Sequence, residues 1–290
     1  MSTCRHHDIS AKFLQVADKT AMASCRAIIS RSKALTPTVR ALELLIAAED
    51  AAAFTFRAGQ WVDLQAPGVE QLGGFSMCSS PASLPTVELA VKDAPNWAPA
   101  RWCYRDAQVG DAVELRVGGD LTIPPSEADA DLLLIAGGIG INPLLSMLRD
   151  LADSAVPQYG MKATGTGRRQ RAHLMYSASS VDELAFLPEI QAMVKKALRY
   201  SVNITAEMRV TGDGAGWTGR RGRFGAPDVA SAVASMSEYG ARSDAKSGAT
   251  LVPARPTVYL CGPPPMIDEL SEHALSEGVP EARVRYERWW

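Results

Sequence analysis

The stretch Asp131-Leu-Leu-Leu-Ile-Ala-Gly-Gly-Ile-Gly-Ile-Asn-Pro143 decides the fold of this chain. Its continuous apolar run, from Leu132 to Ala136, is typical of a strand buried on both faces of a parallel sheet. A glycine-rich turn follows, and apolar residues then recur at helical spacing from Ile141 to Leu151. The stretch therefore predicts a strand, a tight turn and a helix in succession.

Two more units of this kind follow along the chain. The second begins its helix with Ser180-Val-Asp-Glu183, which has the pattern of a capping box, and Gly278 is placed to end the helix of the third. The expected strands are 172–176, 201–208, 257–261 and 284–286, and the expected helices are 187–198 and 266–277. Alternating strands and helices predict a parallel sheet with crossover helices.

The segment before these units has a different texture. Short runs of strand character alternate with Gly, Pro and Asp turns at roughly ten-residue spacing, which predicts an antiparallel β-barrel or sandwich. The expected strands are 39–47, 61–65, 87–91 and 112–117. We therefore expect a barrel domain at 38–125 and an α/β domain at 126–290. The α/β domain has insertions near 153–171 and 209–256, the second containing a short helix at 227–236.

The charge of the chain is divided unevenly. The whole carries 30 Lys and Arg against 32 Asp and Glu, but the first forty residues hold seven basic and two acidic residues. Residues 1–37 are also rich in Ser and Thr, with an amphipathic pattern over 9–29, as in an organellar transit peptide. A flexible extension outside both domains explains the same composition. The first interpretation predicts a mitochondrial protein and the second a cytoplasmic one.

Composition excludes several classes of function. A near-neutral chain lacks the basic surplus that nucleic-acid binding needs, and no run approaches the ~20 apolar residues of a membrane span. The five cysteines are scattered without a Cys-x-x-Cys pair, so neither a disulfide framework nor a metal site is expected.

Three strings could carry chemistry. The glycine turn 137–140 lets backbone N–H groups approach a diphosphate, and Pro143 orients the helix N-terminus towards the anion. The alternative is a plain tight turn, which would use the same glycines. The string Leu260-Cys-Gly-Pro-Pro-Pro-Met266 joins a strand end to a helix, where parallel sheets bind ligands, although Cys261 could equally be a small buried apolar residue. The string Gly73-Gly-Phe-Ser-Met-Cys-Ser-Ser-Pro81 offers hydroxyl and backbone donors, or forms an ordinary turn.

Taken in order, the three strings resemble the ferredoxin-NADP reductase superfamily over residues 38–290. In that family a barrel binds FAD through an Arg-x-Tyr-Ser-type motif, and an α/β domain binds a pyridine dinucleotide through a glycine loop and a Cys-Gly-Pro-x-x-Met motif. The chain looks most like the oxidoreductase-NAD-binding-domain-containing branch, which shares Gly-Gly-Phe-Ser, Cys-Gly-Pro-Pro-Pro-Met and an ending like Glu287-Arg-Trp-Trp290. The resemblance implies FAD and either NADH or NADPH as cofactors.

The resemblance also implies which residues surround the reacting rings. As candidate catalytic residues, Ser76 would lie near the reactive nitrogen of the flavin, Cys261 beside the nicotinamide, and Glu287 on the family's near-terminal Glu-x-aromatic pattern. Phe75 would pack against the flavin, and one of the two terminal tryptophans would cover its ring. The residues implied in cofactor binding are Gly73, Gly74, Phe75, Ser76, Met77, Cys78, Ser79, Lys92, Gly137, Gly138, Gly140, Asn142, Pro143, Ser177, Cys261, Gly262, Pro263, Pro264, Met266, Trp289 and Trp290.

The barrel string departs from the family's pattern at the diphosphate of FAD. Gly73 replaces the arginine that anchors this group, and 97–102 reads Trp-Ala-Pro-Ala-Arg-Trp where a small-residue phosphate loop is expected. Lys92 or Arg101 could supply the lost charge. FMN, or a weakly held flavin, is the alternative to FAD.

The choice of dinucleotide rests on two segments. Ser177, Ser179 and Ser180 have no adjacent arginine to bind a 2′-phosphate, which favours NADH slightly. Arginines of the second insertion could approach the same group and favour NADPH. These are Arg220, Arg221 and Arg223.

The function implied by the resemblance is transfer of hydride from NAD(P)H to flavin. The chain holds no ligand set for an iron–sulfur cluster or haem, so electrons would then pass to a separate acceptor, a protein or a small molecule. A catalytically weak flavin- or nucleotide-binding sensor or assembly module is the alternative that Gly73 favours. A nucleotide enzyme without redox chemistry, such as a methyltransferase, would leave the barrel string without a role.

Overall fold

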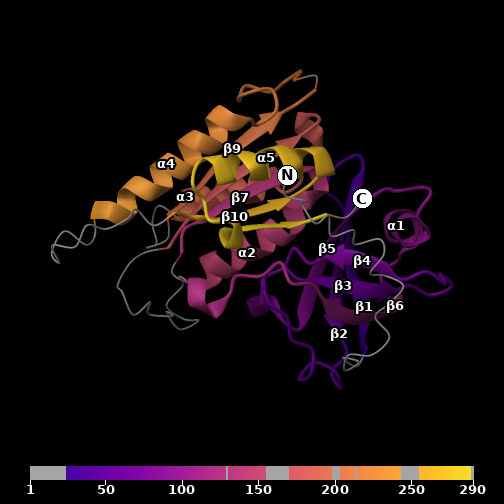
Figure 1. Ribbon diagram of the computed structural model, residues 1–290. Helices are drawn as coiled ribbons and strands as arrows, with labels where there is room; N and C mark the ends of the chain where they lie inside the picture. The colour runs from indigo at the N-terminus through magenta and orange to yellow at the C-terminus, as the bar shows by residue number, and fades with distance from the viewer. Residues whose placement is uncertain are drawn as a thin grey trace, which may run out of the picture.

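The computed structural model describes residues 24–128, 130–154, 170–197, 203–212, 214–242 and 255–288. They form a six-stranded antiparallel sheet followed by a five-stranded parallel sheet with helices on both faces (Figure 1). The predicted fold class is therefore confirmed. No helix among these residues is both long and apolar enough to cross a membrane.

The first sheet has the strand order β4-β3-β6-β1-β2-β5. An antiparallel bridge between Met77 and Leu89 joins the two edges, so the sheet closes into a barrel. The buried residues of its strands form one core together with Phe54, Phe56 and Trp102. The strands are β1 (Cys25–Ala34), β2 (Val39–Ile46), β3 (Trp61–Gln65), β4 (Gly73–Ser76), β5 (Thr86–Lys92) and β6 (Ala112–Gly118), and a four-residue helix, α1 (Ala98–Arg101), follows β5.

The second sheet has the strand order β11-β10-β7-β8-β9. Leu132 and Leu134 of β7 face the side covered by α2 and α3, whereas Leu133 and Ile135 face α4 and α5, so β7 is apolar throughout because both its faces are buried. The strands are β7 (Leu132–Gly137), β8 (Arg171–Ala178), β9 (Asn203–Val210), β10 (Thr257–Cys261) and β11 (Val284–Glu287). The helices are α2 (Ile141–Ser154), α3 (Leu187–Ala197), α4 (Ala226–Arg242) and α5 (Pro264–Ser276).

The expectation that residues 1–37 stand outside both domains is wrong for the part from Cys25. Strand β1 pairs with β2 on one side and with β6 on the other, in the middle of the barrel sheet. Buried Cys25, Ala27 and Ile29 alternate with exposed residues, which is the period of a strand with one face in water. The basic, Ser-rich composition hid this alternation. Residues 1–23 lie outside the described residues, as do most of the expected insertion 153–171 and the end of the insertion 209–256.

The capping box expected at 180–183 is also wrong. Ser180 makes no side-chain capping bond, and Val181–Glu183 form a single 3₁₀ turn. The Glu183 carboxylate instead accepts hydrogen bonds from the hydroxyls of Thr36 (3.2 Å) and Thr38 (2.6 Å). A contact between the two domains therefore replaces the local cap.

Arg149 of α2 forms a dense polar contact between the domains. Its guanidinium donates to the Cys78 carbonyl oxygen (2.7 Å) and pairs with Glu88 (2.5 Å), both in the barrel domain. On its other side it donates to both carboxylate oxygens of Glu189 (2.7 and 2.8 Å), and it lies over the ring of Phe186. One cation thus joins the barrel, α2 and the beginning of α3.

A second network ties the interdomain segment to the parallel sheet. Arg285 of β11 donates to both oxygens of Glu127 (2.8 and 2.7 Å) and to the Tyr259 hydroxyl (2.8 Å), and the Thr257 hydroxyl also donates to Glu127 (2.8 Å). The hydrogen bond from Arg285 holds the pKa of Glu127 below its ordinary value. The segment that links the domains is therefore held against β10 and β11.

We predict that Arg149→Ala lowers the free energy of unfolding by about 2–3 kcal/mol, because it removes charge-assisted hydrogen bonds and leaves two partly buried carboxylates unpaired. The matched control is Arg31→Ala, whose ion pair with Glu43 is exposed and contributes about 0.5 kcal/mol. Urea unfolding of both variants measures the difference. Equal losses would contradict a special role for Arg149.

Candidate functional site

The candidate site lies where the strand order of the parallel sheet reverses. From β7 the chain proceeds outward to β8 and β9, then returns to the other side of β7 to form β10 and β11. Open parallel sheets bind ligands outside the carboxyl ends of the strands at such a switch point. The glycine loop after β7 and the Cys-Gly-Pro-Pro-Pro turn after β10 meet there.

Glycines allow the two turns to pack against each other. A Cβ on Gly140 would lie 2.2 Å from the Cys261 carbonyl oxygen, and a Cβ on Gly137 would lie 2.8 Å from both the Met266 sulfur and Pro263 Cδ. A Cβ on Gly262 would lie 3.0 Å from the Gly137 backbone nitrogen. Three of the predicted glycines thus have a packing role that the sequence did not reveal.

Gly138 is the glycine that leaves space for a ligand. Its φ of +55° suits the turn, and nothing lies within 4 Å of the place a Cβ would take. The loop leads directly into α2, whose N-terminal amides and helix dipole favour an anion. Pro143 is buried in the first turn of α2, and Ser177 at the end of β8 is paired with Gly137. This edge of the sheet fits the diphosphate of a dinucleotide.

Asn142, predicted to bind the cofactor, holds the domains together in this structure. Its side chain is 4% exposed and donates to the Ala90 carbonyl oxygen of β5 at 2.7 Å. Its buried Oδ1 has no hydrogen-bond partner among the described residues. One turn later, the Ser146 hydroxyl donates to the Ser79 carbonyl oxygen (2.6 Å), so the first turns of α2 face the barrel.

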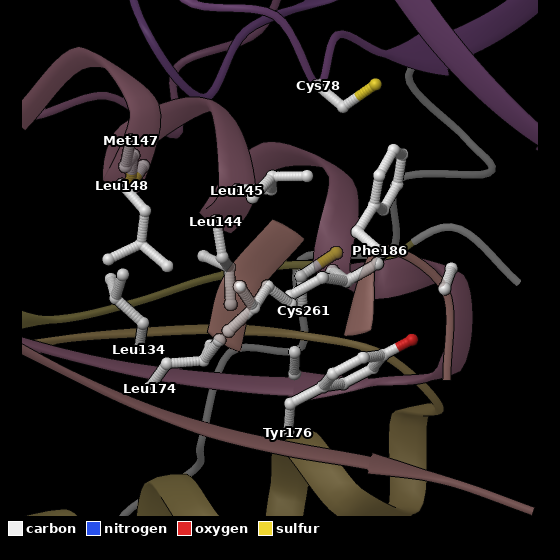
Figure 2. Packing of buried hydrophobic residues seen from close by; sticks show 14 of the residues in the cluster. Cys78, Leu134, Leu144, Leu145, Met147, Leu148, Leu174, Tyr176, Phe186 and Cys261 are labelled. Atoms are coloured by element: carbon white, nitrogen blue, oxygen red, sulfur yellow. The ribbon is translucent and has the colours of Figure 1, made fainter. Parts of the chain in front are cut away.

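Cys261 and Glu287 lie on neighbouring strands at the same level of the sheet. The Cys261 side chain is 1% exposed and lies in the core near Leu144, Leu145 and Phe186 (Figure 2). Burial, and secondarily the negative charge of Glu287, raise the pKa of its thiol well above the ordinary value. Burial therefore favours the neutral thiol of Cys261, a form that can donate a hydrogen bond or pack against a ring.

The barrel string contributes mainly to the barrel itself. Ser76 is buried and paired with Trp61 across β3 and β4. The Cys78 thiol donates to the Glu88 carbonyl oxygen (3.2 Å), the Ser79 hydroxyl accepts from the Glu88 N–H (3.0 Å), and Met77 closes the sheet. The structure thus gives Met77, Cys78 and Ser79 structural roles. Trp289 and Trp290 lie outside the described residues.

Neighbouring side chains close the position where the family has its diphosphate-binding arginine. A Cβ on Gly73 would lie 2.4 Å from the ring of Phe75 and 2.6 Å from Pro99 Cβ, so no longer side chain can stand at this position without rearrangement. Phe75 is buried in the barrel core and lies against Trp97 with ring centroids 5.3 Å apart. Lys92 and Arg101, the proposed replacements for the arginine, are exposed at the ends of β5 and α1.

Two of the three arginines considered for a 2′-phosphate are engaged with the protein, and the third, Arg223, is exposed. Arg220 pairs with Glu207 (3.2 Å), and Arg221 donates to the Gly214 carbonyl oxygen (2.7 Å). Beneath them, Arg209 forms a buried pair with Asp228 and lies 4.3 Å from the ring centroid of Phe224. The sequence analysis did not predict the ion pairs of Arg149 and Arg209. A charged residue within a strand or helix pattern gives no sign of a partner that is distant in the sequence.

Comparison with solved structures defines the class. The chain has the two-domain fold of ferredoxin-NADP reductase-like proteins. It is similar to the flavohem-like FAD/NAD-binding domain of nitric oxide dioxygenase from Vibrio cholerae (TM-score 0.67, 17% identity, 91% of this chain and 98% of that one). It is also similar to ferredoxin-NADP⁺ reductase from Plasmodium falciparum (TM-score 0.67, 15% identity, 92% of this chain and 96% of that one).

Sequence comparison then gives the family. Residues 134–272 match the oxidoreductase NAD-binding domain. The chain is 36% identical over 259 residues to oxidoreductase NAD-binding domain-containing protein 1 from Danio rerio (87% of each chain), and 34% identical over 310 residues to that from Homo sapiens (100% of this chain, 91% of the relative). It belongs to this family of oxidoreductase NAD-binding domain-containing proteins.

We predict that Cys261 resists alkylation in the native protein at pH 8, because its pKa is raised and its sulfur is buried. Because burial disfavours the thiolate in the folded state, this group leaves the stability independent of pH below its unfolded pKa of 9.0 and lowers the stability as the pH rises above that value. Iodoacetamide treatment followed by peptide mass spectrometry checks the prediction, with urea-unfolded protein as the control. Alkylation at the unfolded rate would contradict it.

Proposed function

We propose that this chain oxidises NADH or NADPH, with a flavin as the hydride acceptor and a separate protein or small molecule as the final electron acceptor. The supporting observation is that the glycine turn after β7 and the turn after β10 lie in close backbone contact at the switch point. Beside them, the space next to Gly138 is open. A bound flavin supplies the ability to accept a hydride and release single electrons.

The residues of this chain would bind and orient the dinucleotide. The backbone of Gly137–Gly140 and the N-terminus of α2 would bind its diphosphate, with Ser177 at the next strand end. The neutral thiol of Cys261 and the carboxylate of Glu287 would line the nicotinamide end, and Ser76 would approach from the barrel. The engaged state of Arg220 and Arg221 favours NADH over NADPH.

A sensor or assembly module that binds nucleotide without turnover is the second candidate. The observation in its favour is the filled space beside Gly73, because weak flavin retention would leave the dinucleotide site without its redox partner. The two candidates differ in one measurement. A reductase bleaches the flavin absorption band on anaerobic addition of NADH, whereas a sensor binds NADH without bleaching it.

We predict that Cys261→Ala slows the bleaching of flavin by NADH about tenfold, equivalent to about 1.4 kcal/mol in the barrier, while flavin content stays unchanged. Anaerobic stopped-flow absorbance measures the rate. Cys103→Ala is the matched control, since Cys103 is equally buried but lies in the barrel core. Equal rates in wild type and Cys261→Ala would remove Cys261 from the site.

We also propose that an N-terminal targeting segment directs the protein to the mitochondrion. This segment would end before β1, because removal of β1 would break the barrel sheet. A fusion of residues 1–24 to a fluorescent reporter tests the proposal. We expect the reporter to co-localise with a mitochondrial dye. A reporter spread evenly through the cell would contradict the proposal.

A further inference from the structure

We infer that Glu183 is a positioning residue for the adenosine end of the dinucleotide, and that it acts through the turn 179–183, which its carboxylate ties to the barrel. The inference rests on the proposed function and deepens its dinucleotide site. It follows from the hydrogen bonds that the Glu183 carboxylate accepts from Thr36 and Thr38.

The order of the strands locates the adenosine half of a bound dinucleotide. In the proposed function, the glycine turn after β7 binds the diphosphate, and the nicotinamide lies towards β10 and β11. These two strands stand on one side of β7 in the sheet, and β8 and β9 stand on the other. The adenosine half therefore extends from the diphosphate over the carboxyl ends of β8 and β9.

The turn 179–183 lies at this end of the sheet, because it leads directly out of β8. Ser179 is exposed and Ser180 is half-buried. Neither hydroxyl makes a hydrogen bond with another of the residues that the structure describes. The turn thus presents two hydroxyl groups, each able to donate and to accept, to the adenosine end of a ligand.

Two tertiary contacts hold this turn in place. On one side, the Gly212 N–H donates to the Ser179 carbonyl oxygen (2.9 Å), which ties the turn to the chain after β9. On the other side, the Glu183 carboxylate accepts from the hydroxyls of Thr38 (2.6 Å) and Thr36 (3.2 Å) of the barrel. Hydrogen bonds to a carboxylate are stronger than those between neutral groups. Removing them frees the Glu183 end of the turn.

The two threonines stand on a barrel turn that is itself well held. Pro37 between them has a fixed φ, and its carbonyl oxygen accepts from the Tyr104 hydroxyl (2.6 Å). The Thr38 carbonyl oxygen accepts from the Asp93 N–H (2.8 Å). The barrel is therefore a firm support against which Glu183 fixes the turn beside the dinucleotide.

The test titrates the full chain with NADH and with ADP-ribose, which carries the adenosine half without the nicotinamide. We expect Thr38→Val to raise both dissociation constants about fivefold, because one charge-assisted hydrogen bond to the turn is lost. The rate of flavin bleaching at saturating NADH is expected to stay unchanged, since the nicotinamide end does not involve this turn. Thr38→Ser keeps the hydroxyl and is expected to bind both ligands as the wild type does.

Glu183→Ala removes the same contact from its other side. We expect it to weaken ADP-ribose binding at least as much as Thr38→Val, and the double variant to bind no more weakly than Glu183→Ala alone. The matched control is Thr257→Val, which removes a hydroxyl bond to Glu127 (2.8 Å) at the start of β10 and is expected to leave ADP-ribose binding unchanged. Additive losses in the double variant, or an equal loss in Thr257→Val, would overturn the inference.

The inference and the proposed function fail in different ways. Wild-type affinity for ADP-ribose in both Thr38→Val and Glu183→Ala would overturn the inference, and bleaching of the flavin by NADH in the same proteins would leave the proposed function intact. A wild-type protein that binds neither ADP-ribose nor NADH would contradict the proposed function, and the inference with it.

Discussion

The close backbone contact between the turn after β7 and the turn after β10 is the constraint on which the rest of the structure depends. Gly140 can approach the Cys261 carbonyl only because it has no side chain, and Gly137 makes room for Met266 and Pro263. This contact determines how closely the ends of β7 and β10 approach each other at the switch point. It also determines the position of the N-terminus of α2, which follows the first of the two turns. Through α2, it also sets how the barrel meets the α/β domain, because Asn142, Ser146 and Arg149 all bond to the barrel.

The two domains consequently share one core rather than touching through a polar surface. Ala58, Cys78 and Ala90 of the barrel belong to the same buried cluster as Leu144, Met147 and Leu148 of α2. Arg149 then supplies hydrogen bonds to carbonyl and carboxylate groups that this packing would otherwise leave buried and unpaired. The contact between the domains is thus formed largely by α2.

Much of the fold was predictable from local patterns. The runs 61–65 and 257–261 are strands with those bounds, and the glycine turn and helix after β7 are where the sequence places them. Strand β1 was missed because its charged and Ser-rich outward face dominates the composition, and the capping box failed because Glu183 has partners among Thr36 and Thr38 in the other domain. For the site, the three motifs were found, but Met77, Cys78, Ser79 and Asn142 serve packing between elements that no local pattern displays.

The sequence by itself determined that a barrel precedes an α/β domain, because this order follows from the periodicity of apolar residues. It also determined the glycine turn after β7 and the glycine in place of an arginine at position 73, because both depend on residue identity at fixed spacing. Only the tertiary structure decided what occupies the space beside Gly73. Phe75 comes from the same strand, but Trp97 and Pro99 reach the space from a segment more than twenty residues away, so its apolar character arises when these residues are packed together. The burial of Cys261, and with it the neutral state of its thiol, was likewise decided by packing against α2 and its neighbours.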